Sequence, residues 1–186
     1  EPIANSMYTY DHVMGHTLAK QACAYAVTGN HPLLFVGSPG IGKTMLMQQL
    51  PSLMPYLSNT QAIENCCISA IQTATPTYSV VPPFRTPHHT ISFAGMIGGQ
   101  NPPKPGEITL ANHGILFLDE LGEYQRSILE TLREPMEAKC IHISRAGNSL
   151  SFPANFLLVA AMNPCPCGYS LDTRHMCQCP PTKRST

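Results

Sequence analysis

One eight-residue segment has the residue types and the spacing that bind phosphate. It reads GSPGIGKT and matches the pattern G-x-x-x-x-G-K-T in full. Glycines let the backbone approach phosphate closely, and successive N–H groups form a concave anion site. Lys43 would reach the β- and γ-phosphates, and the Thr44 hydroxyl would ligate Mg²⁺. ATP and Mg²⁺ are therefore the predicted ligands, and a coincidental glycine loop is the alternative. The residues predicted to contact the nucleotide are Gly37, Ser38, Pro39, Gly40, Ile41, Gly42, Lys43 and Thr44.

Two carboxylates and one amide stand where other strands of the same sheet are expected to end. Asp119 and Glu120 follow the apolar run Ile115–Leu118, and Asn163 closes the run Phe156–Met162. Ligands of open α/β sheets bind at the carboxyl ends of the strands. Asp119 is predicted to hold Mg²⁺, and Glu120 to orient and polarise the attacking water. Asn163 would hold that water or the γ-phosphate. The alternatives are a solvated acidic turn and a turn-forming asparagine before proline.

Four of the eight cysteines cluster near the end of the chain, in the pattern C-x-C…C-x-C. They are Cys165, Cys167, Cys177 and Cys179. Four thiolates can form the tetrahedral sulfur set that Zn²⁺ prefers, so a zinc knuckle is predicted. His175 could replace one sulfur. Free thiols in a tail and disulfides formed during purification are the alternatives.

These side chains need strands and helices to position them. Buried strands are expected at His31–Val36, Ile115–Leu118 and Phe156–Met162, a further strand at Val80–Thr86, and a hairpin of Cys140–Ser144 with Ser149–Phe152. Helices are expected at Gly15–Thr28, Lys43–Leu50, Ser58–Ala74, Ile108–His113 and Glu123–Ala138, and an exposed loop at Ser92–Gly106. Alternating helices and buried strands predict an α/β fold with a mostly parallel sheet.

Composition limits the class of protein. The chain has 186 residues, 43% of them hydrophobic, which suits one α/β domain with a small appendage. Eleven basic and eleven acidic residues give a net charge near zero, which offers no electrostatic argument for nucleic acid. No long apolar run and no signal peptide is visible, so a cytoplasmic protein without a membrane partner is expected. Residues 1–163 are predicted to form a truncated nucleotide-binding core, and residues 164–186 a cysteine-rich segment.

The sequences of several segments resemble those of a known family. GSPGIGKT, LFLDE and LVAAMN look like Walker A, Walker B and sensor-1 of AAA+ ATPases. PFRTPHHTIS, GEITLANHGILFLDEL, LREPMEAKCIHISRAG and FPANFLLVAAMNPCPCGY resemble the magnesium-chelatase-like ComM/YifB family, from about Asp11 to Cys179. The resemblance implies a P-loop NTPase fold of three layers (α/β/α), with a loop inserted into its second helix and a β-hairpin before sensor-1. The family's helical lid has no counterpart here. Gly37–Thr44, Asp119, Glu120 and Asn163 carry over as nucleotide-site residues.

The resemblance also implies roles for residues outside these motifs. Val13 and Met14 lie in the segment that borders adenine in AAA+ proteins, with helix-entry packing as the alternative. Phe93 and Met96 lie in the inserted loop, which would face a ring pore and touch a polymer there. The alternative is a surface loop held down by its apolar residues. Arg145 is the candidate arginine finger acting on a neighbouring subunit.

Other basic residues compete for roles or stay open. Arg126 and Arg133 compete with Arg145, and solvent salt bridges on a helix are their alternative. His88 and His89 are adjacent, are expected to point apart, and so should not share a metal; a role in the pore or near the phosphate stays open.

The family implies a ring, most often a hexamer, in which Mg²⁺-dependent ATP hydrolysis drives DNA remodelling of the branch-migration helicase type. A magnesium-chelatase subunit that drives metal insertion, and an AAA+ transcription-activator-like regulator, are alternatives. A non-catalytic, zinc-stapled binding module is a further one. Without lid and finger, the isolated chain is expected to bind ATP, whereas its hydrolysis depends on what lies outside it.

Overall fold

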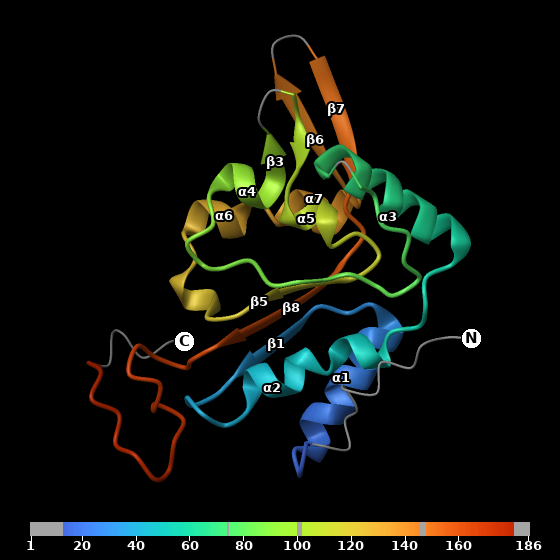
Figure 1. Cartoon of the computed structure of the whole chain (residues 1–186). Coiled ribbons are helices and arrows are strands. Elements are labelled where there is room, and N and C mark those ends of the chain that lie inside the picture. Colours follow the sequence, from blue (N-terminus) through green and yellow to red (C-terminus); the bar gives the residue numbers. More distant parts are fainter. Residues whose placement is uncertain (1–12, 74, 100–101, 146–147, 181–186) are drawn as a thin grey trace.

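The computed structural model describes residues 13–73, 75–99, 102–145 and 148–180, and of residues 144, 145, 148 and 149 it describes the backbone alone. A four-stranded parallel sheet lies at its centre, in the order β1 (Leu33–Val36), β8 (Leu157–Met162), β5 (Ile115–Leu118), β2 (Phe84–Arg85). Helices cover both faces (Figure 1). The α/β P-loop NTPase fold with three layers is therefore confirmed.

Strand β5 shows why the sheet has a core on each side. All four of its residues are buried. Leu116 and Leu118 join the hydrophobic core on one face of the sheet, whereas Ile115 and Phe117 join the core on the other face. Successive side chains of a strand point to opposite faces, so an uninterrupted apolar run is what a strand covered on both faces requires.

Helices α1 (Thr17–Gly29) and α2 (Lys43–Gln48) cover one face, and α2 is followed by the 3₁₀ helix η2 (Leu50–Leu53), which contains Pro51. On the other side, α3 (Asn59–Gln72) begins at a capping box in which Ser58 and Gln61 satisfy each other's backbone N–H groups. No helix in the described part of the chain is long and apolar enough to cross a bilayer.

Two predicted elements are shorter than the sequence suggested. The strand expected at Val80–Thr86 is reduced to the two residues of β2, because Pro82 and Pro83 cannot donate to a strand ladder. The helix expected at Glu123–Ala138 is divided into η3 (Leu121–Glu123), α6 (Arg126–Glu130) and α7 (Arg133–Ala138). Pro135 has no N–H to donate to the carbonyl oxygen of Thr131, so the helical hydrogen-bond ladder is interrupted between α6 and α7.

The segment between α3 and β5 differs most from its prediction. Instead of an exposed loop at Ser92–Gly106 it forms α4 (Phe93–Ile97) and the strands β3 (Gly98–Gly99) and β4 (Lys104–Pro105), with residues 100 and 101 outside the described part. The next helix, α5 (Glu107–Leu110), overlaps the short helix expected at Ile108–His113. The backbones pack closely: a Cβ on Gly106 would lie 2.3 Å from the Gly98 nitrogen. We call residues 92–106 the insert.

The hairpin expected before the third buried strand is confirmed. Strands β6 (Cys140–Arg145) and β7 (Asn148–Pro153) pair antiparallel. Figure 1 shows that they project away from the central sheet.

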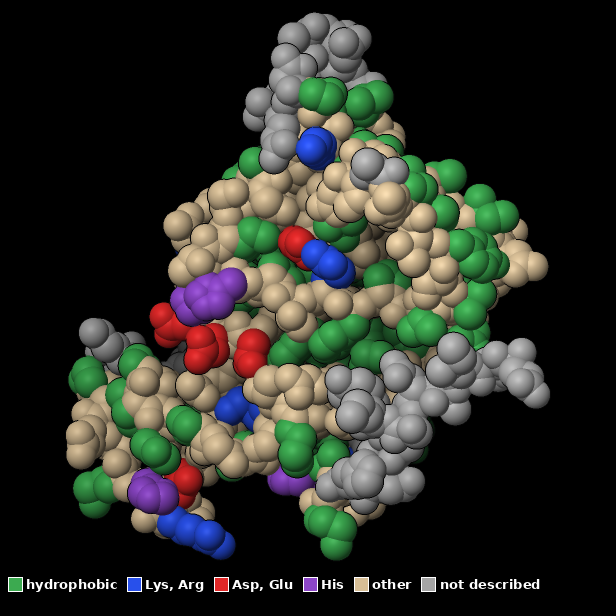
Figure 2. Space-filling view, in the orientation of Figure 1, with side chains coloured by type: hydrophobic (Ala, Val, Ile, Leu, Met, Phe, Trp, Pro, Cys, Tyr) green, Lys and Arg blue, Asp and Glu red, His purple; other side chains and the backbone are tan. Residues whose placement is uncertain are grey.

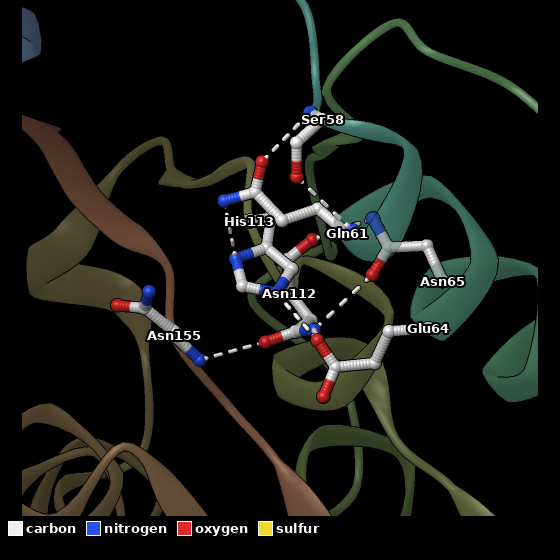
Figure 3. Close-up of polar contacts among 7 residues, drawn as sticks. All are labelled: Ser58, Gln61, Glu64, Asn65, Asn112, His113 and Asn155. Atoms are coloured by element: carbon white, nitrogen blue, oxygen red, sulfur yellow. Dashed lines mark hydrogen bonds and ion pairs between the residues drawn. The ribbon is translucent and has the colours of Figure 1, made fainter.

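A buried polar network holds α3 to the amino-terminal ends of β5 and β8 (Figure 3). The Asn112 amide is fully buried; it accepts from the Asn155 N–H at 2.9 Å and donates to Asn65 at 3.1 Å and to Glu64 at 3.3 Å. His113 Nε2 lies 2.5 Å from Glu64 Oε2. Because buried polar groups are costly when unpaired, each member depends on the others.

We expect Asn112→Ala to lower the free energy of unfolding by about 2–3 kcal/mol, because it leaves the Asn155 N–H and the Asn65 carbonyl without their partner. Urea unfolding followed by circular dichroism would measure the loss. Asn59→Ala is the matched control, since Asn59 is exposed and its amide, among the described residues, bonds only to the exposed Tyr78 hydroxyl. Equal stability of the two variants would contradict the importance of the network.

Candidate functional site

Three parallel strands end together at one edge of the sheet and bring the predicted residues there. In the register of the sheet, Val36 pairs with Met162 and Leu118 pairs with Ala160. The chain therefore leaves β1 into the glycine-rich loop, leaves β8 at Asn163 and leaves β5 at Asp119, all at the same edge. Because β8 lies between β1 and β5, Asn163 stands between the loop and the carboxylates.

The glycine-rich loop needs glycine at two positions. Gly40 has φ 77° and Gly42 has φ 87°, conformations that L-residues with a Cβ rarely adopt. Gly42 immediately precedes α2, so the loop turns directly into the helix that begins at Lys43. A loop with this conformation can direct backbone N–H groups to an anion, and the first turn of the helix adds its own N–H groups.

Lys43 links the loop to the end of β8. Its ammonium group donates to the carbonyl oxygens of Gly37 at 2.6 Å and Ser38 at 3.0 Å, and to Asn163 Oδ1 at 3.1 Å. Burial lowers the pKa of the Lys43 ammonium below its ordinary value, and the nearby Asp119 carboxylate opposes that shift. The charge is thus held between two of the strand ends.

Thr44 and Asp119 join the phosphate loop after β1 to the end of β5. The Thr44 hydroxyl donates to Asp119 Oδ2 at 2.8 Å, and the second oxygen of Asp119 accepts the Glu120 N–H at 2.9 Å. A hydroxyl and a carboxylate oxygen side by side are the donor set that Mg²⁺ takes in nucleotide sites. The residues predicted for Mg²⁺ are therefore in contact.

Glu120 adopts a left-handed backbone conformation, φ 52°, at the start of η3. Its side chain is 60% exposed, and its Oε2 lies 3.5 Å from His89 Nδ1. The turn after β5 thus points the carboxylate outwards beside Asp119, where it can reach a water molecule.

The segment after β2 supplies a wall that the sequence reasoning mostly missed. A cleft at the strand ends is lined by Thr44, Gln48, Thr86, Pro87, His88, His89, Phe117, Asp119 and Glu120. In Figure 2, histidine and acidic side chains lie next to one another over this region. A sequence signal existed, because the expected strand at Val80–Thr86 would also have ended at this edge.

The two histidines do not point apart as predicted. The rings of His88 and His89 lie 4.1 Å from centre to centre, and His88 Nδ1 lies 2.8 Å from the Thr90 hydroxyl. The turn after Pro87 folds both rings to one side, and His89 also meets the ring of Tyr124 edge-on. Burial, and then Asp119, raise the pKa of Tyr124 to about 12, so this ring stays neutral.

Other predicted residues lie away from the strand ends or apart from each other. Val13 is buried beneath α1, which fits the packing alternative, whereas Met14 is 86% exposed; Asp11 and His12 lie outside the described residues. Met96 is fully buried in the core, so the prediction that it contacts a polymer at the surface is wrong. Met96 is buried because it lies in the short helix α4, which packs against the core. Phe93 remains 56% exposed.

The candidate arginines divide into two groups. Arg145 ends β6 at the far end of the hairpin, and its side chain lies outside the described part. Arg126 and Arg133 form exposed i,i+4 ion pairs with Glu130 and Glu137, the solvent salt bridges that were their alternative.

The four clustered cysteines come together in space. The sulfurs of Cys165, Cys167, Cys177 and Cys179 all lie within 4.8 Å of one another. His175 is not in that group; its Nδ1 lies 3.5 Å from an oxygen of Asp172.

Comparison with known proteins adds three relatives. Residues 9–186 match the model of the family described as magnesium chelatase, subunit ChlI. Competence protein ComM of Haemophilus influenzae is 46% identical over 165 residues, which are 88% of this chain and 32% of that protein. An uncharacterized protein YifB of Salmonella typhimurium is 44% identical over 89% of this chain and 33% of its own length. The magnesium-chelatase 38 kDa subunit of Cereibacter sphaeroides is 24% identical over 84% of this chain and 53% of its own. The chain thus spans about a third of the length of its ComM and YifB relatives.

Proposed function

Because this chain belongs to the magnesium-chelatase ChlI family, on its ComM/YifB side, we propose that it is the nucleotide-binding core of a ring-forming, Mg²⁺-dependent AAA+ ATPase. The observation that carries the proposal is the hydrogen bond from the Thr44 hydroxyl to Asp119, at 2.8 Å. It joins the end of the phosphate loop to the first carboxylate after β5, which is the pair that a nucleotide-bound Mg²⁺ requires.

The residues present fit ATP and Mg²⁺. Gly40 and Gly42 have the conformations that a phosphate-cradling loop needs, and Lys43 places a cation over that loop. Thr44 and Asp119 would hold the metal ion, which supplies charge neutralisation on the phosphates when bound. Asp119 thereby leaves Glu120 free of metal binding, beside the same cleft.

In this proposal the Glu120 carboxylate accepts a proton from water as the water oxygen attacks the γ-phosphorus, and ADP leaves with the bridging oxygen. Asn163 holds the attacking water or the γ-phosphate from the side of β8. Its amide oxygen accepts a hydrogen bond from the Lys43 ammonium at 3.1 Å. His89 contacts Glu120 and positions its side chain.

The second half of the site would come from a neighbouring subunit. We place Arg145 there as the finger, because the hairpin carries it away from its own strand ends (Figure 1). Stabilisation of γ-phosphate charge by an arginine in trans is worth several orders of magnitude in rate. Ring assembly, most simply a hexamer, is therefore part of the proposal.

DNA is the proposed polymer because of the similarity to a competence protein, at 46% identity. Phe93, the exposed first residue of α4 in the insert, is the candidate contact. ATP hydrolysis would move the inserts of successive subunits along the strand, and the whole protein would act as a DNA-remodelling, branch-migration helicase.

The experiment is DNA binding and DNA-stimulated ATP hydrolysis by the whole protein, measured over a range of salt concentrations. We expect the logarithm of the binding constant for branched DNA to fall linearly with the logarithm of the salt concentration, with a slope of about −0.9 for each phosphate neutralised. Turnover should rise when DNA is added. Binding no tighter than that of an unrelated neutral protein at low salt, with no stimulation, would overturn the DNA part alone.

A magnesium-chelatase-type subunit is the second candidate, favoured by the 24% identity to the 38 kDa subunit over 84% of this chain. It would use the same residues for ATP and drive metal insertion into a tetrapyrrole. Turnover stimulated by a porphyrin-binding partner and indifferent to DNA would select it.

A further inference from the structure

The cysteine-rich segment, residues 164–179, is arranged around its four sulfurs. The Cys165 sulfur lies 3.4 Å from that of Cys167 and 3.8 Å from that of Cys177, and the latter two lie 3.6 Å apart. A zinc ion with four sulfur ligands at about 2.3 Å holds them about 3.8 Å from one another. The Cys167 N–H also donates to the Cys179 sulfur at 3.3 Å, the kind of bond that supports a metal-bound thiolate.

Little else holds this segment together. Between Pro164 and Pro180, all of which the structure describes, there is no helix or strand. Its larger apolar side chains point to solvent: Leu171 is 68% exposed and Met176 is 91% exposed. Its local bonds are those of turns: Gly168 N–H donates to the Cys165 carbonyl at 2.8 Å, Asp172 N–H to the Tyr169 carbonyl at 3.1 Å, and the N–H groups of Arg174 and His175 to Asp172 Oδ1 at 2.7 and 3.1 Å. The Tyr169 and His175 rings lie 4.9 Å apart, and the Ser170 hydroxyl donates to the Pro164 carbonyl at 3.3 Å. A segment without an apolar core needs another centre, and a structural metal provides one.

The same segment lies against the phosphate loop. It begins directly after Asn163, which meets Lys43. Gly168, at φ 83°, packs so closely that a Cβ there would lie 2.5 Å from Pro39 Cδ. The backbone N–H groups of Arg174 and His175 lower the pKa of the Asp172 carboxyl, and the Ser38 side chain of the loop adds a smaller contribution in the same direction.

We propose that Cys165, Cys167, Cys177 and Cys179 bind one Zn²⁺, and that the metal holds residues 164–179 as a wall of the nucleotide site. The metal fixes the segment between its two cysteine pairs. The fixed segment continues directly from Asn163, which meets Lys43, and packs at Gly168 against Pro39 of the phosphate loop, so it holds both in place. The second half of this inference rests on the proposed nucleotide binding; the first does not.

Metal content tests the first half. The whole protein, purified without added metal, is expected to contain one zinc per chain by elemental analysis. The double variant Cys177→Ser, Cys179→Ser should lose it, whereas Cys66→Ser, Cys67→Ser, an adjacent pair on α3, should retain it. Iron in place of zinc, less than about a tenth of an equivalent in the wild type, or zinc retained by the Cys177, Cys179 variant would overturn the metal site.

Nucleotide affinity tests the second half. Removing zinc from the wild type with a chelator should weaken binding of a fluorescent ADP analogue about tenfold, and adding zinc back should restore it. Gly168→Ala keeps all four sulfurs and places a Cβ 2.5 Å from Pro39 Cδ, so it should keep the zinc and still weaken binding by displacing the phosphate loop. Unchanged affinity in both measurements would overturn the coupling. A wild type that binds zinc and no nucleotide would instead overturn the proposed function.

Discussion

Glu120→Gln is expected to leave ATP bound and to reduce its turnover by about 10²–10⁴-fold, the usual worth of a general base. The substitution keeps the shape of the side chain and removes the proton acceptor. Glu120 is 60% exposed and lies beside Asp119, so folding should not depend on its charge. Turnover of Mg²⁺-ATP by the whole protein, and the Kd of an ATP analogue, would be measured together.

Glu123→Gln is the matched control for this experiment. Glu123 is exposed in η3, only three residues further on, and it does not line the cleft at the strand ends. Its turnover should equal that of the wild type. Wild-type turnover in the Glu120 variant would remove Glu120 from the mechanism, and equal losses in both variants would indicate a general effect of charge near the cleft.

Lys43→Ala is expected to weaken binding of ATP and ADP by roughly 10- to 100-fold, because a charge-assisted hydrogen bond is worth about 1.5–3 kcal/mol. The ammonium would turn from the Gly37 and Ser38 carbonyl oxygens towards the phosphates. Lys43→Arg should rescue binding only in part, since the flat guanidinium group does not fit where a point charge sits among three oxygens.

Lys139→Gln removes one positive charge at the end of α7, where the side chain is exposed, and serves as its control. Nucleotide affinity would be measured by fluorescence or calorimetry, with thermal unfolding recorded for each variant. Tight binding by a folded Lys43→Ala protein would contradict the assignment of Gly37–Thr44 as the phosphate site.

How much could be predicted from the sequence depends on how local the signal is. The loop at Gly37–Thr44 is recognisable because its backbone requires positive φ at Gly40 and Gly42, which glycine adopts without strain. Strand β5 was recognisable because four consecutive apolar residues suit burial on both faces. By contrast, no local pattern placed Met96 in the core, since it stands in a glycine-rich stretch and its burial comes from packing with distant strands and helices.

The sequence by itself determined which groups stand at the ends of strands: a glycine loop with Lys43 and Thr44, two carboxylates, and Asn163. These follow from short-range rules of chain geometry and residue type. Only the tertiary structure decided that β8 lies between β1 and β5, which brings Asn163 to Lys43, and that His89 meets Glu120. It also decided that four sulfurs gather, and that Gly168 in the same segment packs against Pro39. Strand order and such contacts depend on pairings between residues far apart along the chain, and periodicity within a segment carries no information about them.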